Sequence, residues 1–285
     1  MPRSIIADAR LLAAACILCL AFTTHRAAAE TLVLEQDLDG FSGFEDTSLY
    51  EDFVTRAGGG IDGIFSGTIR TGFLRRALIR VHLPELPEGA TLTGVTLRLN
   101  VDRSGENFGD LEFGLHRITR NWGEGNAVVE GSPGGVGAPA AEGDATWNDN
   151  FFMQSQWTAP GGDFEAEPSA SAVAGQSMDI VEWTGAGLLA DVQAWLETPE
   201  SNFGWMIVYA DEGTPQRVKK FYSSEALGLR PQLLLDYTLS APPTGCAALQ
   251  YFQQPLQEYF GDLLLLAFAL GGLCAMCMKN PSRTN

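Results

Sequence analysis

The side chains of this chain that could carry out acid–base or nucleophilic chemistry include very few histidines. His82 and His116 are the only two beyond the first 29 residues, and both lie in runs that alternate like strands. Acyl transfer needs a nucleophile beside a base, and neither histidine lies in a G-x-S-x-G turn or an H-E-x-x-H helix. We therefore predict that both histidines are structural, with no catalytic residue and no zinc site.

Carboxylates are abundant, and they raise two other kinds of chemistry. Cleavage of a sugar chain would need two of them facing one cleft, and a structural calcium ion would need several clustered oxygen ligands. The candidates are Glu124, Asp144, Asp163 and Glu225. The spacing in a single sequence does not show whether two of them face one cleft, and the calcium-loop pattern D-x-[DN]-x-[DN]-G is absent. The sequence therefore predicts a protein that is not an enzyme and has no cofactor, and a structural calcium ion stays open with its ligands unassigned.

Aromatic side chains are the stronger candidates for ligand binding, because sugar rings stack on flat, exposed aromatic faces. Trp157 and Phe152 lie in an irregular region, 148–177, between two groups of predicted strands. Trp157 shortly precedes Pro160-Gly161-Gly162, so a loop tip could present it to solvent. We predict Trp157 and Phe152 as ligand-binding residues, and the alternative is an indole buried beneath a loop.

The elements that would position these side chains are mostly strands. Short runs of alternating apolar and polar residues are divided by turns rich in glycine and proline, which is typical of an all-β sandwich or jelly roll. The predicted strands are 31–38, 77–83, 92–101, 111–118, 178–183, 203–209, 220–224 and 232–238.

One segment has the period of a helix. An apolar stripe runs through Leu188, Val192 and Leu196, and Pro199 prevents its continuation. We predict a short helix that lies as a lid across one end of the sandwich. The segment 123–144 is rich in glycine, alanine and proline, and we expect it to be a long loop.

The N-terminal residues 1–29 have the layout of a secretory signal peptide. Arg3 and Arg10 form a positive region, 11–22 is apolar, and three alanines precede Glu30. The apolar run is shorter than the ~20 residues of a spanning helix. We predict cleavage before Glu30, and the alternative is an uncleaved anchor.

The C-terminal part has the layout of a membrane anchor. A linker, 241–262, leads to an uncharged stretch, 263–278, and a basic end, 279–285, follows with Lys279 and Arg283. The stretch would form a helix about 24 Å long, against a hydrocarbon core of ~30 Å. It is either a transmembrane or sorting-tail segment, retained or cleaved, or a buried amphipathic helix. Because basic residues favour the cytoplasmic side, we expect the domain 30–240 on the periplasmic or extracellular face of a bacterial membrane.

Charge and cysteine content limit the partners further. The net charge of −17 argues against nucleic acid and against electrostatic binding to anionic membranes or polyanions. The domain 30–240 contains no cysteine, so it has neither a disulfide nor a thiolate metal site. The oligomeric state is left undetermined by the sequence.

Several short motifs, taken in order, resemble the DNRLRE domains of exported bacterial proteins. The resemblance covers about residues 30–239. Its motifs are Arg75-Arg76-Ala77-Leu78-Ile79-Arg80, Leu86-Pro87-Glu88-Gly89-Ala90, Val95-Thr96-Leu97-Arg98-Leu99, Leu115-His116-Arg117, Asn121-Trp122-Gly123-Glu124-Gly125, Gly143-Asp144-Ala145-Thr146-Trp147, Gly161-Gly162-Asp163-Phe164, Ala190-Asp191-Val192-Gln193-Ala194-Trp195, Asn202-Phe203-Gly204-Trp205, Phe221-Tyr222-Ser223-Ser224-Glu225 and Arg230-Pro231-Gln232-Leu233.

This resemblance implies a jelly-roll β-sandwich, and some members of the family are carbohydrate-binding modules. We therefore expect a noncatalytic, membrane-tethered module for cell-surface binding or adhesion, with polysaccharide as the candidate partner. The alternatives are an extracellular glycan hydrolase or lyase, and a purely structural envelope protein. The ligand itself is not identified by the sequence.

The signal-peptide hypothesis predicts that the mature chain begins at Glu30, because the three alanines before it suit the signal peptidase. N-terminal sequencing of the protein recovered from the membrane fraction measures this directly. Recovery of an intact Met1 would show that the leader is retained.

Overall fold

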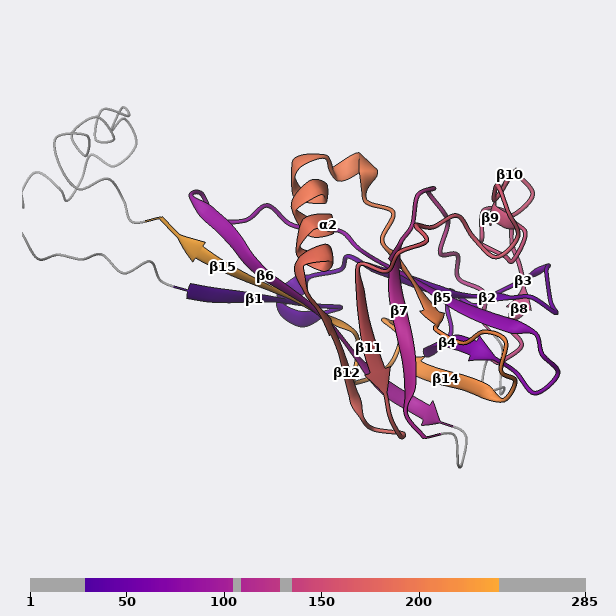
Figure 1. The fold of residues 1–285 in the computed structure, drawn as a ribbon. Coiled ribbons are helices and arrows are strands. Elements are labelled where there is room, and N and C mark those ends of the chain that lie inside the picture. Colours follow the sequence, from indigo (N-terminus) through magenta and orange to yellow (C-terminus); the bar gives the residue numbers. More distant parts are fainter. Residues whose placement is uncertain (1–28, 105–108, 129–134, 241–285) are drawn as a thin grey trace, which may run out of the picture. The chain divides into compact units, whose positions relative to one another are not determined.

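The computed structural model describes residues 29–104, 109–128 and 135–240 (Figure 1). The predicted leader (except its last residue), the linker and the predicted membrane segment lie outside these residues. Within the described part of the chain, no helix combines the length and the apolar character needed to cross a membrane.

The described residues are mostly strands. The strands are β1 (Ala29–Glu35), β2 (Phe44–Tyr50), β3 (Arg56–Ala57), β4 (Gly63–Thr68), β5 (Leu74–Val81), β6 (Ala90–Ser104), β7 (Leu111–Arg117), β8 (Ala138–Pro139), β9 (Asp149–Phe151), β10 (Ser155–Gln156), β11 (Ala170–Ala174), β12 (Ile180–Thr184), β13 (Trp205–Tyr209), β14 (Arg217–Tyr222) and β15 (Gln232–Leu239). The helical elements are α2 (Ala186–Glu197) and two single 3₁₀ turns, Leu38–Gly40 and Pro199–Ser201.

One curled antiparallel sheet contains most of these strands, and β6 is its longest member (Figure 1). The first part of β6 pairs with β15 and β12, and β1 pairs with the other side of β15. The last part of β6 pairs with β14, which continues through β4, β5, β13 and β7 to β11. Strand β2 lies along the remaining side of β5. A single strand thus belongs to both halves of the sheet, which curl toward each other.

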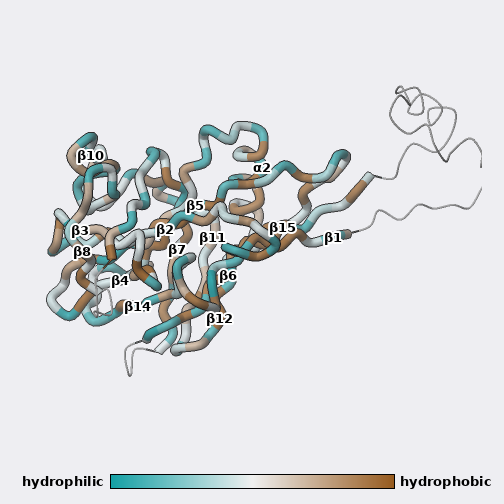
Figure 2. Tube along the Cα trace, turned by 180° about the vertical axis from the view of Figure 1, so that it is seen from behind, coloured by the Kyte–Doolittle hydropathy of each residue, from teal (hydrophilic) through white to brown (hydrophobic). Residues whose placement is uncertain are grey.

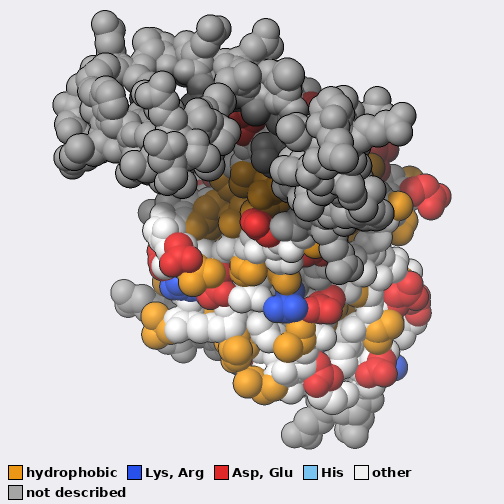
Figure 3. All heavy atoms as spheres, turned by 90° about the vertical axis from the view of Figure 1, so that its left-hand side faces the viewer, with side chains coloured by type: hydrophobic (Ala, Val, Ile, Leu, Met, Phe, Trp, Pro, Cys, Tyr) orange, Lys and Arg blue, Asp and Glu red, His pale blue; other side chains and the backbone are white. Residues whose placement is uncertain are grey.

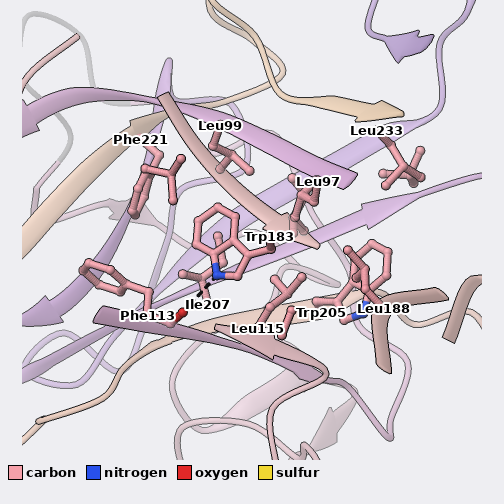
Figure 4. Close-up of a cluster of buried hydrophobic side chains, with 14 of the residues drawn as sticks. Leu97, Leu99, Phe113, Leu115, Trp183, Leu188, Trp205, Ile207, Phe221 and Leu233 are labelled. Atoms are coloured by element: carbon pink, nitrogen blue, oxygen red, sulfur yellow. Dashed lines mark hydrogen bonds between the residues drawn. The ribbon is translucent and has the colours of Figure 1, made fainter. Parts of the chain in front are cut away.

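The main core lies between the two halves of the sheet (Figure 4). Leu97 and Leu99 of β6 face it from one half, and Phe113 of β7 faces it from the other. Trp183 of β12 has no exposed surface, and its Nε1 donates a hydrogen bond to the carbonyl oxygen of Phe113 at 2.9 Å. Phe221 meets both aromatic rings edge-on. The buried indole is thus satisfied by the backbone of the opposite half of the sheet.

Helix α2 covers one edge of this core. Leu188, Val192 and Trp195 are buried, and the helix packs on β6, β11 and β12. Asp191, on the same helix, accepts a hydrogen bond of 2.8 Å from Nε1 of Trp205, which lies on β13. The helix predicted from the apolar stripe is therefore confirmed.

The all-β prediction is also confirmed, and eight strands were predicted from their alternation. Strand β2 was missed because its polar residues Asp46, Thr47 and Ser48 are buried, which breaks the alternation. The hydroxyl oxygen of Ser48 accepts the backbone N–H of Phe65 at 2.9 Å, and that of Thr47 accepts the N–H of Gly58. The region 148–177, predicted to be irregular, contains β9, β10 and β11.

The surface reflects the composition. Hydropathy alternates along the strands, as expected for residues that point in turn toward the core and toward solvent (Figure 2). On the face drawn in Figure 3, acidic and apolar side chains are spread widely and basic ones are few. This distribution agrees with the net charge of −17.

Replacement of Trp183 by alanine should lower the free energy of unfolding by about 3–5 kcal/mol, because it leaves a cavity and removes the hydrogen bond to Phe113. Denaturant unfolding followed by circular dichroism measures the loss. Ile180→Ala is the matched control on the same strand, since Ile180 is 60% exposed, and it should cost only about 0.5 kcal/mol or less. Equal losses for the two variants would contradict this description of the core.

Candidate functional site

Two open hollows lie side by side on the described surface and share Phe164. The first has a volume of about 620 Å³. Its lining comes from β5, the residues after β7 and the turn before Phe164: Arg76, Thr119, Arg120, Thr158, Ala159, Pro160, Gly162, Asp163 and Phe164. The second hollow has a volume of about 440 Å³ and lies over β7 and β13. We call the two hollows together the groove.

The turn 158–163 forms one wall of the groove, and its sequence explains its shape. The carboxylate of Asp163 accepts the backbone N–H groups of Thr158 and Ala159 at 2.9–3.3 Å, which closes the turn. Gly162 has a φ of 102°, and a Cβ there would lie 2.3 Å from Cε of Met206. The positive φ favours glycine at this position, and a larger residue would also displace the end of the Met206 side chain.

Arg76 forms the floor between the two hollows. Its Nε and Nη2 donate to the two carboxylate oxygens of Glu212, both at 2.8 Å, and its Nη1 donates to the carbonyl oxygen of Gly161. The guanidinium also lies over the rings of Trp147 and Phe164, at 5.3 and 5.1 Å from their centroids. A planar fork held by a bidentate pair and two rings is rigid. Arg76 therefore fixes the groove and has few donors left for a ligand.

Arg120 is the cation that faces the open side of the groove. Its side chain is 43% exposed, and its nearest partners are distant: Oδ2 of Asp163 at 3.9 Å and Oγ1 of Thr158 at 3.4 Å. An exposed pair at such distances contributes little, so the guanidinium can turn toward a ligand.

The second hollow offers acceptors and a small aromatic surface. His116 meets the ring of Phe164 edge-on at 5.4 Å, and its Nδ1 lies 2.9 Å from the carbonyl oxygen of Glu165. The remaining lining is Glu112, Gly114, Pro168, Ser171, Val208, Tyr209, Ala210 and Glu212. The groove as a whole therefore presents carboxylates, hydroxyls, the weakly paired guanidinium of Arg120 and aromatic edges, which suits hydrogen bonding to a ligand with many hydroxyl groups.

Trp157 does not lie where the sequence predicted. It is only 5% exposed, and its Nε1 donates to the carbonyl oxygen of Thr146 at 2.9 Å. It packs in a second apolar cluster with Trp122 and Trp147. We had expected the turn that follows it to present it to solvent. Phe152 is half-buried on the turn after β9 and lines neither hollow of the groove. The expected exposure of Trp157 was wrong, because its indole is packed in this cluster and its N–H is bonded to the backbone.

Burial extends to every tryptophan of the chain. All six lie in the described residues, and none is more than 6% exposed. A flat platform of exposed indoles is therefore absent, and the aromatic rings that line the groove are those of Phe164, Tyr209 and His116. The sequence marked Arg76 and Gly161-Gly162-Asp163-Phe164 only as parts of family-like motifs, and it gave no signal for Arg120.

Two of the four carboxylates named from the sequence come together elsewhere. Glu124 and Glu225 both lie near Asp46 of β2, and we call these three residues the acid cluster. Oε1 of Glu124 accepts the backbone N–H of Asp46 at 2.7 Å, and Oδ2 of Asp46 accepts the backbone N–H of Ser224 at 2.8 Å. Asp144 lies apart and accepts the N–H of Ala141.

Burial dominates the electrostatics of the acid cluster. Desolvation raises the pKa of Glu124 to about 8, and the negative charge of Glu225 adds to the rise. Burial and the charge of Glu225 also raise the pKa of Asp46 well above its usual value, against the hydrogen bond from Ser224. Partial desolvation also raises the pKa of Glu225, although this side chain is the most exposed of the three. These carboxyls therefore bind protons at a pH where ordinary carboxyls are ionised.

His82 lies at the surface and does not join a catalytic arrangement. Its Nε2 is 3.1 Å from Oε1 of Glu45, which also binds Arg80. Burial alone would raise the pKa of Glu45, but His82 and Arg80 lower it below the usual value. In the described ranges, no group of three or more His, Cys, Asp or Glu side chains is arranged to hold a metal ion.

No family model and no curated protein sequence matches this chain. The groove and the acid cluster are therefore interpreted from their own geometry.

Replacement of Trp157 by alanine should lower the free energy of unfolding by about 3–5 kcal/mol, since it empties a buried site. Phe152→Ala is the comparison, because Phe152 is half-buried and should cost less. Thermal and denaturant unfolding of both variants provide the test. A Trp157→Ala variant as stable as the wild type would show that the indole lies outside the core.

Proposed function

We propose that residues 30–240 form a noncatalytic, exported module that binds polysaccharide in the groove. The observation that carries this proposal is that two hollows meet at Phe164. The ring of Phe164, the guanidinium of Arg120 and several oxygen acceptors line one open surface there. Polysaccharides present hydroxyl groups on their edges and C–H groups on their faces. A groove with hydrogen-bonding groups around an aromatic ring matches both.

The parts of the groove have different roles in this proposal. Arg120 donates hydrogen bonds to sugar hydroxyls in the first hollow. In the second hollow, the carboxylate of Glu112 accepts hydrogen bonds from them, and the hydroxyl of Ser171 accepts or donates. The ring of Phe164 packs against a sugar face. The pair between Arg76 and Glu212 holds the floor between the two ends, so the site is formed before the ligand arrives.

We also propose that the fold is a jelly roll of the DNRLRE type. The two curled halves that share β6, together with the motif order along the chain, support this assignment. Members of that family include carbohydrate-binding modules, which supports a glycan ligand here. In this proposal the apolar segment 263–278 tethers the module to a membrane, with the groove on the periplasmic or extracellular side.

Replacement of Arg120 by alanine should weaken polysaccharide binding by about tenfold, which corresponds to ~1.4 kcal/mol. The change should leave the melting temperature close to the wild-type value, since Arg120 is well exposed. Affinity gel electrophoresis of the full chain against a panel of neutral and charged polysaccharides measures the effect.

Two further variants complete this experiment. Phe164→Ala should also weaken binding, and Arg103→Ala should not, because Arg103 is an exposed residue of β6 that lines neither hollow. If no polysaccharide retards the wild type, the purely structural role is favoured. If Arg120→Ala and Arg103→Ala bind equally well, the groove is not the site.

A second candidate function is a glycan hydrolase or lyase, and the acid cluster favours it. A carboxyl with a pKa near 8 beside other carboxyls is the kind of group that acts as a general acid at neutral pH. Release of reducing ends from a bound polysaccharide, lost in Glu124→Gln, would establish this activity. Binding without release of reducing ends supports the noncatalytic module.

A further inference from the structure

The acid cluster connects three segments that are far apart in the sequence. Asp46 belongs to β2, Glu124 follows β7, and Glu225 follows β14. The hydrogen bonds from the backbone of Asp46 to Glu124 and from Ser224 to Asp46 run through the cluster from one segment to the next. Any change in the charge of these carboxyls therefore acts on the attachment of the residues after β14.

Asp46 is the unusual member of the cluster. It is entirely buried, and its Oδ1 has no hydrogen-bond partner among the described residues. A buried carboxylate oxygen without a donor is costly, and two more carboxyls face the same site. A proton held within the cluster removes part of the charge and provides the missing donor, in the manner of carboxyls that share a proton.

The positively charged side chains near the cluster form ion pairs with carboxylates outside it. Arg80 of β5 acts on Glu124, but it forms an ion pair with Glu45 and donates to Oδ1 of Asn121. Arg230 acts on Glu225, but it is bonded to Asp37.

Charged groups from the other elements that pack on β2 also have partners. Arg75 of β5 is paired with Asp52, and Asp62, before β4, is paired with Lys220. His82 is bound to Glu45. Negative charge at the acid cluster is therefore only partly compensated by the described cations.

We propose that Asp46, Glu124 and Glu225 form a proton-operated latch, which holds the segment 223–230 against β2 when the cluster is protonated and releases it when the cluster ionises. This inference is independent of the polysaccharide site, because the latch residues line neither hollow of the groove.

The segment 223–230 is suited to such release. At its start, Ser223 donates its hydroxyl to the carbonyl oxygen of Ile61 at 2.7 Å, next to the bond from Ser224 to Asp46. At its end, Arg230 donates to the carbonyl oxygen of Gln36. Between these points Leu227 is fully exposed. Polar attachments and one small buried apolar side chain, Ala226, therefore hold the segment, and segments with so little apolar burial open locally at low cost.

Release would also change the surface. Glu225, Leu227 and Leu229 line a hollow of about 490 Å³, together with Asp62, Tyr222, Ala226 and Gly228. Movement of the segment would widen or remove this hollow. The latch thus couples proton binding at Asp46 to the shape of a surface that solvent and partners can reach.

The direction of the pH effect follows from proton linkage. A carboxyl whose pKa is raised in the closed state binds a proton that the open state gives up. The latch is therefore fully stabilised below the ordinary carboxyl pKa of about 4.5. That stabilisation is lost as the pH rises toward about 8, the pKa of Glu124 in the closed state.

Hydrogen exchange measured by mass spectrometry on the full chain tests the latch. Rates are divided by the intrinsic rate at each pH, so that only protection is compared. Protection of the amides of Ser224 and Ala226 should fall by about tenfold or more between about pH 5 and about pH 9. Protection in β5 should stay constant over the same range.

Asp46→Asn mimics the protonated side chain and keeps an acceptor for Ser224, so its protection should depend less on pH than that of the wild type, with Glu124 and Glu225 still titrating. If that variant does not fold, Glu124→Gln should flatten the profile in the same way. The matched control is Glu88→Gln, an exposed carboxyl outside the cluster, which should keep the wild-type profile. The latch is excluded if wild-type protection is the same at both ends of the range or if Asp46→Asn keeps the full pH dependence. Calcium chloride that restores protection at about pH 9 in the wild type but not in Asp46→Asn would also overturn it, in favour of a cation.

Discussion

The hydrogen bond from the indole of Trp183 to the carbonyl oxygen of Phe113 is the constraint on which the arrangement of this domain depends. It joins β12 in one half of the sheet to β7 in the other, through the middle of the core. A buried indole N–H must find an acceptor, so the two halves have one preferred alignment. Phe221 packs edge-on against both rings and opposes any slide between them.

The position of the groove depends on that alignment of the two halves of the sheet. Strand β7 supplies Gly114 and His116 to the floor of the second hollow, and the residues directly after it supply Arg120 to the first. An isolated backbone bridge between Ile118 and Phe164 connects the shared residue to the position directly after β7. A rigid sheet therefore determines the spacing of the groups in the groove, while the turns determine only their exposure.

The domain contains no cysteine, and buried polar side chains connect its segments instead. Lys219 is fully buried, and its ammonium group donates to the hydroxyl of Ser104 and to the carbonyl oxygens of Gly109 and Gly175. The buried carboxylate of Asp191 likewise accepts a hydrogen bond from the indole N–H of Trp205. Each contact joins segments that are distant in sequence, as a disulfide would. Each is also lost when one partner is removed.

The sequence was informative where periodicity is strong. The alternation in β6 and β7 and the stripe of α2 predicted elements close to those observed, because one face of each is buried and apolar. Strand β2 was hidden because Asp46, Thr47 and Ser48 are buried polar residues. Trp157 was misplaced because local composition does not show that residues from distant segments pack against its indole. The groove and the acid cluster depend on contacts between distant segments, which single-sequence patterns do not contain.

The place of β15 has a mechanical consequence. This strand is flanked by β1 on one side and β6 on the other, and both ladders run along nearly its whole length. Ladder hydrogen bonds lie across the strands. A force that pulls on the chain after Leu239 while the groove is held in place acts along β15, so it loads many of these bonds at once in shear. A pull between Ala29 and Leu239 would instead peel β1 from β15 one pair at a time. The domain should therefore resist force well in the first direction and yield readily in the second.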